Sequence, residues 1–411
     1  MKNILGLTLG IMTALGGFVD LGQIIFTMQA GALFGYSLLW VMIPGTIAVI
    51  LYMEMCGRIA AVAHRPVFEV IRKRMGKRLG VATLAASNLL NLITCAAELC
   101  GVGIVLKLLT GWNARLSMCA AVALLVVLIW LMKFQWIERT FGISGLLMVV
   151  FAVSVFVIKP DWHAVGSGFL PRVPTHGSHD TLLYAYFAVG IFSALLMEYE
   201  VHFYSSGAIE EDWKIENLNE NILVATLGTI LGALLTCALL ILAALVFLPR
   251  HIFPEILSTT VMPAAVKLGP TTVRIALLGM LACIAGAAVE TALSGAYNIC
   301  QFYDLAWGKN KKPTSVAIFT GIWIGMFITA TGLALSGIEP TTLVNVGIIF
   351  GMVIMPITYY PILRSAGDRK LLGKHANNKF LNFAAWSMLA IITVAALAAL
   401  PLMIITNSGQ P

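Results

Sequence analysis

Eleven hydrophobic runs, each long enough to cross a lipid bilayer, limit what this chain can fold into. A transmembrane helix needs about 20 mainly apolar residues, and inside a bilayer only helices or closed barrels satisfy every backbone polar group. Of the 411 residues, 59% are hydrophobic and only 11% are charged, which excludes a soluble fold. We therefore predict an all-α, multi-pass membrane protein with a single domain over residues 1–411. The predicted spans are 4–28, 37–62, 79–109, 116–134, 140–158, 181–205, 221–247, 272–304, 314–335, 340–363 and 380–406.

The positive charges predict which side of the membrane each loop faces. With the N-terminus inside, the cytoplasmic segments hold 19 of the 26 Lys and Arg residues, including the clusters Arg72–Arg78 and Arg369–Lys374. Lys and Arg favour the cytoplasmic side. We therefore predict a cytoplasmic N-terminus, an external C-terminus and a location in the plasma membrane or bacterial inner membrane. The net charge of +7 then belongs to these loops and does not indicate a nucleic-acid partner. The segment 64–78 is too polar to span and is expected to form an amphipathic helix at the cytoplasmic face.

Carboxylates occur deep inside the first and sixth spans, where lipid makes a charge costly. Asp20 lies in the first, and Glu198 and Glu200 lie in the sixth. A charge at the bilayer centre costs about 2.5–3.5 kcal/mol on insertion scales, so such groups usually face a partner or an aqueous cavity. A cation is the simplest partner for clustered carboxylates, which predicts an ion-binding site.

The neighbours of these acids suggest which ion is bound. Asp20 and Gln23 offer hard oxygen donors suited to manganese, ferrous iron or magnesium, three residues apart. Ala194 and Met197 repeat this spacing in the sixth span, and the Met197 thioether is a soft ligand that favours transition metals. The alternatives are that Asp20 caps backbone amides at a glycine kink and that Met197 serves only in packing.

Further acids and a histidine suggest either added site charge or a route for protons. Glu198 and Glu200 are about 200° apart on a regular helix, so both face one cavity only if the backbone unwinds. Otherwise Glu198 pairs with His202 four residues on, as a proton relay, or is hydrated in a vestibule. Glu98 and Glu290, in the third and eighth spans, either carry protons or hold a broken helix by hydrogen bonds.

Unusual residues in spans one and six indicate an internal repeat. Two five-helix repeats, about 4–158 and 181–363, would be inverted relative to each other, with an extra helix at about 380–406. Transporters of this build bind substrate near the midplane, where such spans are broken. Gly16-Gly17 and Gly22 lower the cost of unwinding span one. No Pro or Gly between Phe192 and Ser205 marks a break in span six.

Several motifs, in the same order, resemble those of the Nramp family of divalent metal transporters, which has a LeuT-type fold. The resemblance covers roughly residues 10–375 and rests on Gln29–Trp40 (QAGALFGYSLLW), Ala97-Glu98 and Asp368–Gly373 (DRKLLG). It implies that spans one and six are unwound at the midplane. It further implies a metal site of Asp20, Gln23 in the place of the family's asparagine, the Ala194 carbonyl and the selective Met197 thioether.

The chain departs from the family pattern at the site itself. Asp20-Leu21-Gly22-Gln23 lacks the proline of the family's Asp-Pro-Gly-Asn, and Met197-Glu198-Tyr199 lacks the proline and histidine of its Met-Pro-His. Cys95 aligns with a family aspartate. These departures remove most of the implied proton route, while Glu198 and Glu200 would make the site harder and more negative.

Together these patterns predict a monomeric secondary transporter that imports manganese or ferrous iron, with the metal ion as substrate and no cofactor. Proton coupling stays open. One alternative is a uniporter of the same family for magnesium or another hard cation. The other is an amino-acid or organic-substrate carrier of LeuT-type fold, although clustered acids would repel a substrate carboxylate. The chain lacks HExxH, nucleophile-elbow and phosphate-loop motifs, so we do not expect an enzyme.

Overall fold

The computed structural model describes residues 19–173 and 177–410, and every regular element within these two ranges is a helix. Ten helical segments there are long and apolar enough to cross a membrane, and the predicted spans two to eleven match them to within a few residues. Predicted span one lies mostly outside the described residues. Its visible end is α2 (Leu21–Phe34), which continues well past residue 28. The ten segments are formed by α3 (Met42–Ala63), α5 (Lys77–Thr110), α6 (Ala114–Leu131), α7 (Phe134–Gly145) with α8 (Val149–Ile158), α10 (Gly177–Leu196) with α11 (Glu198–Glu210), α12 (Leu218–Val246), α15 (Pro270–Tyr303), α16 (Ala317–Leu335), α17 (Pro340–Ala366) and α19 (Lys379–Ile405).

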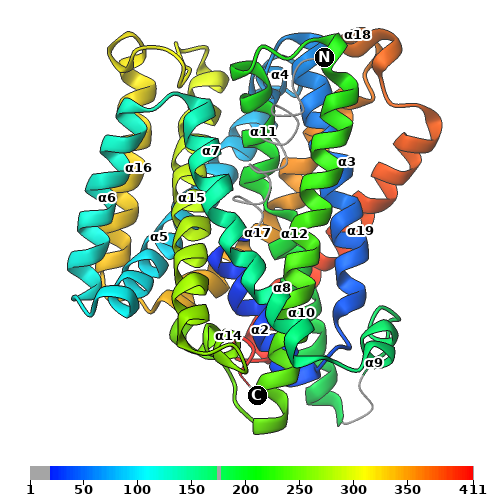
Figure 1. Ribbon diagram of the computed structural model, residues 1–411. Helices are drawn as coiled ribbons and strands as arrows, with labels where there is room; N and C mark the ends of the chain where they lie inside the picture. The colour runs from blue at the N-terminus through cyan, green and yellow to red at the C-terminus, as the bar shows by residue number, and fades with distance from the viewer. Residues whose placement is uncertain (1–18, 174–176, 411) are drawn as a thin grey trace.

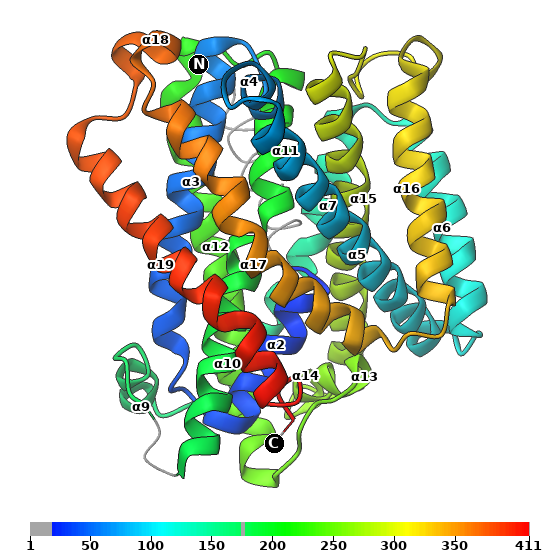
Figure 2. The ribbon, with the colours of Figure 1, turned by 180° about the vertical axis from the view of Figure 1, so that it is seen from behind.

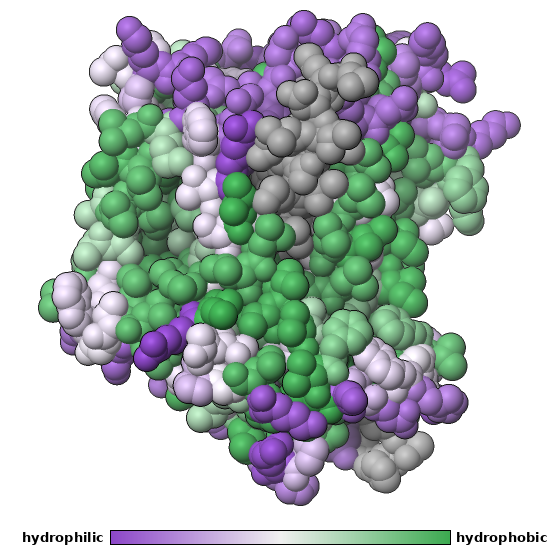
Figure 3. Space-filling view, in the orientation of Figure 1, coloured by the Kyte–Doolittle hydropathy of each residue, from purple (hydrophilic) through white to green (hydrophobic). Residues whose placement is uncertain are grey.

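The surface has the pattern expected of a protein surrounded by lipid. An apolar belt separates two polar ends (Figure 3). The outer helices α6 and α19 expose large apolar side chains, among them Leu131, Phe380 and Leu397, each more than 70% exposed. Water would disfavour such side chains, whereas lipid tails solvate them. The predicted all-α membrane fold is therefore confirmed.

The two ends of the bundle differ in charge. The short helices α4 (Val67–Arg74) and α18 (Arg369–Leu372) lie at one end (Figure 1, top) and are joined by an ion pair between Arg74 and Asp368. Helix α4 is the amphipathic helix predicted within 64–78, since it buries an apolar face and carries basic residues in its last turn. The residues that follow α19 lie at the opposite end. Both dense basic clusters therefore share one face of the membrane protein.

Two unusually long helices form the frame of the centre. Helices α5 and α15 have 34 residues each and pack against one another. At about 1.5 Å per residue each is near 50 Å long, more than the roughly 30 Å hydrocarbon thickness, so each must tilt. The oblique path of α5 is visible in Figure 2. They are the third members of the two expected repeats, and they flank the broken helices described next.

Candidate functional site

The start of helix α2 is held by two carboxylates. Helix α2 begins at Leu21, and Asp20 before it has an extended backbone, with φ −83° and ψ 175°. Its Oδ1 accepts a hydrogen bond of 2.7 Å from the Gln23 backbone N–H, which is N-cap geometry. Oε1 of Glu98 on α5 accepts a hydrogen bond of 3.1 Å from the Leu21 N–H. Both acids therefore satisfy free N–H groups at the positive end of the α2 dipole.

A helix break occurs at one residue of the sixth span. Helix α10 ends at Leu196 and α11 begins at Glu198, while Met197 between them has φ 16° and ψ 84°, outside the helical range. The Tyr359 hydroxyl of α17 donates to the Leu196 carbonyl, which the break leaves without a helical partner. Ser294 Oγ of α15 donates to the carbonyl of Tyr199, at 3.2 Å. Side chains from neighbouring helices thus hold a break that has no Pro or Gly of its own.

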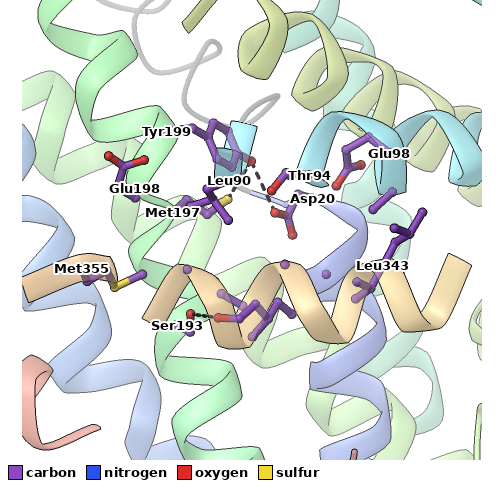
Figure 4. A pocket seen from close by; sticks show the side chains of 17 residues that line it. Asp20, Leu90, Thr94, Glu98, Ser193, Met197, Glu198, Tyr199, Leu343 and Met355 are labelled. Atoms are coloured by element: carbon purple, nitrogen blue, oxygen red, sulfur yellow. Dashed lines mark hydrogen bonds between the residues drawn. The ribbon is translucent and has the colours of Figure 1, made fainter. Parts of the chain in front are cut away.

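The start of α2 and the break at Met197 meet at a buried cavity. Figure 4 shows Asp20 and Met197 converging on the Tyr199 hydroxyl, which lies 3.4 Å from Asp20 Oδ2 and 3.1 Å from Met197 Sδ. The structure therefore brings together Asp20 and Met197, which are far apart in sequence. Ala194 also lines the cavity. The complete lining is Asp20, Gly22, Leu90, Thr94, Ala97, Glu98, Ser193, Ala194, Met197, Glu198, Tyr199, Leu343, Val344, Gly347, Ile348, Gly351 and Met355.

A glycine next to Asp20 allows α17 to approach the cavity. A Cβ atom at Gly22 would lie 2.9 Å from Ile348 Cδ1 and 3.3 Å from Asp20 Oδ1. The Ile348 carbonyl in turn accepts a 2.6 Å hydrogen bond from Ser193 Oγ, which ties α17 to α10. Gly22 lies within α2 and permits close packing of this helix against α17, whereas the sequence suggested that Gly22 eases unwinding.

Gln23 does not reach the cavity. Its Nε2 donates a hydrogen bond of 2.7 Å to Thr236 Oγ1 on α12, and Gln23 is absent from the cavity lining. The reason is the position of the helix start. Because α2 begins at Leu21, the Asp20 carboxylate folds back over the Gln23 N–H, and the Gln23 side chain follows the helix surface towards α12. Its Oε1 is buried and has no hydrogen-bond partner among the described residues, and the pairing of Gln23 with Asp20 around one ion stays a prediction.

Glu198 and His202 lie together, as their spacing of four residues predicts. Oε1 of Glu198 accepts from Ser87 Oγ on α5 and lies 3.0 Å from His202 Nε2. Both side chains are fully buried, and the Phe68 ring of α4 lies 4.7 Å from the His202 ring. In Figure 4 the Glu198 carboxylate is turned away from Asp20. It therefore borders the cavity without pointing at the two converging side chains.

Glu200 and Glu290 lie outside the central cavity. Helix α11 is regular from Glu198 onwards, so Glu200 leaves the helix in another direction from Glu198, as expected for residues two apart. Glu290 of α15 lines a separate cavity with Glu138 of α7 and Phe203 of α11. Glu138 was not predicted as a site residue, because its neighbour Arg139 gives it the appearance of a loop charge.

A larger cavity lies beside the central one, at the end of the bundle opposite α4 and α18. Both cavities lie along α2 and α17. Leu21 and Val346 line the larger cavity, and their neighbours Asp20 and Gly347 line the central one. Two exposed carboxylates also line it: Glu255 in the segment before α13 (Leu257–Thr260), and Glu339 at the start of α17. The larger cavity therefore lies between that end of the bundle and the cavity that Asp20 lines.

The donor set of the central cavity is mixed. Across residues 19–173 and 177–410, no three His, Cys, Asp or Glu side chains gather closely enough to hold a metal ion by themselves. An ion bound to Asp20 would therefore need the Met197 thioether, backbone carbonyls such as that of Ala194, or water as its other ligands. Such a mixed set of ligands suits an ion that is bound and then released better than a metal that stays bound.

Comparison with known proteins gives a consistent result along the whole chain. The family model described as "Nramp: Natural resistance-associated macrophage protein-like" matches residues 10–401. The divalent metal cation transporter MntH of Deinococcus radiodurans is 25% identical over 396 residues, which cover 92% of this chain and 85% of that protein. MntH of Bacillus subtilis is 27% identical over 393 residues, covering 92% and 87%. In fold, the crystal structure of an Eremococcus coleocola manganese transporter matches with a TM-score of 0.73 and 19% identity, covering 98% of this chain and 87% of that one.

Proposed function

Because the chain belongs to the Nramp-like family of membrane transporters, we propose that it imports divalent metal cations across the plasma membrane, with manganese or ferrous iron as the preferred ions. The N-terminus would be cytoplasmic, as the basic loops suggest. The metal is a substrate, and the protein is a transporter and not an enzyme. The MntH relatives are named as divalent metal cation transporters, which supports this proposal.

The observation that carries the proposal is the meeting of Asp20 with Met197. One hydroxyl lies within hydrogen-bond distance of both side chains, although they are 177 positions apart in the sequence, Asp20 at the start of α2 and Met197 at a break in the sixth span. Breaks at membrane depth expose backbone carbonyls and helix ends only where they line a cavity or bind a substrate. A carboxylate and a thioether in one cavity, with the Ala194 backbone beside them, offer ligands that suit a divalent transition metal.

The same donors support manganese or ferrous iron over magnesium. Magnesium requires near-octahedral oxygen ligands and gains little from sulfur, and Met197 brings a sulfur atom to the cavity. Glu98 and Glu198 also line the cavity and add negative charge, which suits any divalent cation. An organic substrate with its own carboxylate is disfavoured, because no Lys or Arg stands among the described lining residues.

Coupling to protons would need groups other than those the family resemblance implies. Glu98 of α5 accepts a hydrogen bond from the Leu21 N–H at the start of α2, and its carboxylate is engaged there. Glu198 with His202, and Glu290 in the neighbouring cavity, are the remaining candidates for a proton pathway. We propose that transport is either uncoupled from protons or coupled to them through these groups, and a pH indicator inside the liposomes separates the two cases.

Uptake of manganese into proteoliposomes tests the proposal. The wild-type protein should accumulate Mn²⁺ with saturation, and Asp20→Ala should reduce uptake to the level of empty liposomes. Glu216→Ala provides a matched control, because Glu216 is an exposed carboxylate outside every cavity described above. Uptake by Asp20→Ala with an unchanged KM would show that the cation does not bind here. A thermal-shift screen of metal ions against amino acids tests the organic-substrate alternative.

A further inference from the structure

Tyr199 has a position in the cavity that the predicted ligand set does not explain. It lies in the first turn of α11, two residues after the break, and is only 2% exposed. Its hydroxyl is 3.1 Å from Met197 Sδ and 3.4 Å from Asp20 Oδ2. A phenol has one O–H proton, so it donates to one of the two groups at a time. The hydroxyl therefore lies between the two side chains that are to bind the cation.

The backbone of Tyr199 is fixed by a second contact. Its carbonyl accepts the hydrogen bond from Ser294 Oγ on α15. The preceding residue, Glu198, is held through its side chain by Ser87 on α5. Because main chain and neighbour are both anchored, the hydroxyl can leave its place only by rotation of the Tyr199 side chain. Among the described residues, Asp20 and Met197 are its two hydrogen-bond acceptors.

We propose that the Tyr199 hydroxyl competes with the transported cation for Asp20 and Met197, and that this residue thereby sets the affinity of the site. This inference rests on the proposed function. A cation that binds both groups needs the carboxylate oxygen and the sulfur lone pair that the hydroxyl engages. Binding therefore breaks a buried hydrogen bond to a charged group, which weakens the affinity and eases release of the ion.

The competition also affects selectivity. A hard ion such as Mg²⁺ gains most of its binding energy from carboxylate and water oxygens and little from sulfur. The hydroxyl can then remain bonded to Met197 while the ion holds Asp20. A softer ion such as Cd²⁺ needs the sulfur and must displace the hydroxyl from both groups. Tyr199 consequently penalises soft ions more than hard ions and partly offsets the preference that Met197 gives.

Tyr199→Phe tests this inference, because it removes the hydroxyl and keeps the ring. Isothermal titration of the full-length protein should give Mn²⁺ and Cd²⁺ dissociation constants about tenfold lower than wild type, from the lower end of the net worth of one hydrogen bond to a charged group. The constant for Mg²⁺ should change by less than about twofold. Tyr204→Phe is the matched control, since Tyr204 is on the same helix and its hydroxyl bonds Asn221 Oδ1 at 3.1 Å. It should leave all three constants unchanged.

A spectroscopic measurement keeps the inference testable if Tyr199→Phe lowers stability. Titration of the wild type with Mn²⁺ should produce a tyrosine ultraviolet difference band as the hydroxyl loses its acceptors. That band should persist in Tyr204→Phe and vanish in Tyr199→Phe.

Weaker or equal binding of Mn²⁺ by a folded Tyr199→Phe protein would overturn the inference, and so would the persistence of the band in that variant. Asp20→Ala separates this failure from a failure of the proposed function. If Asp20→Ala abolishes Mn²⁺ binding while Tyr199→Phe changes nothing, only the role of Tyr199 is wrong. If Asp20→Ala leaves Mn²⁺ binding intact, the site itself is wrong.

Discussion

Asp20 has two roles in this structure, and two substitutions separate them. Its Oδ1 caps α2 through the Gln23 N–H, and its Oδ2 faces Met197 and Tyr199 across the cavity. Asparagine is as good an N-cap as aspartate but has no charge, whereas alanine neither caps nor carries charge. Asp20→Asn should therefore lose the cation and keep the helix start, and Asp20→Ala should lose both.

The magnitudes follow from the two contacts. Two unit charges 4 Å apart interact by about 4 kcal/mol at an effective dielectric constant of 20, and the double charge of the cation raises this further. The Asn amide dipole and extra water recover part of the loss. We expect about 3 kcal/mol to remain, which weakens Mn²⁺ binding about 100-fold. Loss of the cap in Asp20→Ala should cost a further 1 kcal/mol or so in the free energy of unfolding, independent of the metal.

Isothermal titration measures the first effect, and thermal unfolding in detergent without added metal measures the second. The expected pattern is strong loss of Mn²⁺ binding in both variants, with a lower melting temperature in Asp20→Ala alone. Binding within threefold of wild type in Asp20→Asn would refute the electrostatic argument. Equal melting temperatures of the two variants would refute the assignment of Asp20 as a cap.

Three further predictions concern the other contacts. Met197→Ala should increase Mg²⁺ or Ca²⁺ transport relative to Cd²⁺, and an unchanged ratio in competitive uptake would remove the thioether from the selectivity argument. Glu255→Gln with Glu339→Gln removes the two exposed carboxylates of the larger cavity. This double change should raise the KM for Mn²⁺ several-fold at low ionic strength and little at 0.5 M salt, because exposed charges are screened. A salt-independent change would show that these charges do not attract the cation electrostatically. Tyr359→Phe should lower the free energy of unfolding by about 1–3 kcal/mol, since it leaves the buried Leu196 carbonyl without its donor; equal melting temperatures would show that the break has another support.

Most of the fold was predictable from the sequence because the bilayer fixes the length of its helices. Ten predicted spans match the helices to within a few residues, and the polar segment 64–78 contains α4. The irregular backbone at Asp20 was also predictable, since a carboxylate beside glycines inside an apolar run is a local signal. In each case the information lies within about 20 consecutive residues, which is the range over which hydropathy and capping act.

The break in span six was predicted from the family resemblance, but the contacts that hold it and the details of the site were beyond sequence reasoning because they join distant residues. The donor to the Leu196 carbonyl is Tyr359, 163 positions away, and no local pattern around Met197 indicates it. Gln23 was expected beside Asp20 from its spacing and from the family resemblance, and neither indicates that its amide nitrogen donates to Thr236 on another helix. Tyr199 was noticed only as a departure from the family pattern, and its contacts with Asp20 and Met197 appear only in three dimensions.

The start of α2 and the break at Met197 are supported from different directions, and this difference bears on how the cavity can open. Asp20 and Glu98 hold the start of α2, so that helix end depends on α5 and on its own cap. The break at Met197 depends on Tyr359 of α17 and on Ser294 of α15. A shift of α17 away from α10 would remove the donor from Leu196 and the Ser193 to Ile348 bond together, while α2 and α5 stay joined. Movement of α17 should therefore change the Met197 side of the site and leave Asp20 in place, so that a bound cation would lose its soft ligand before its charged one.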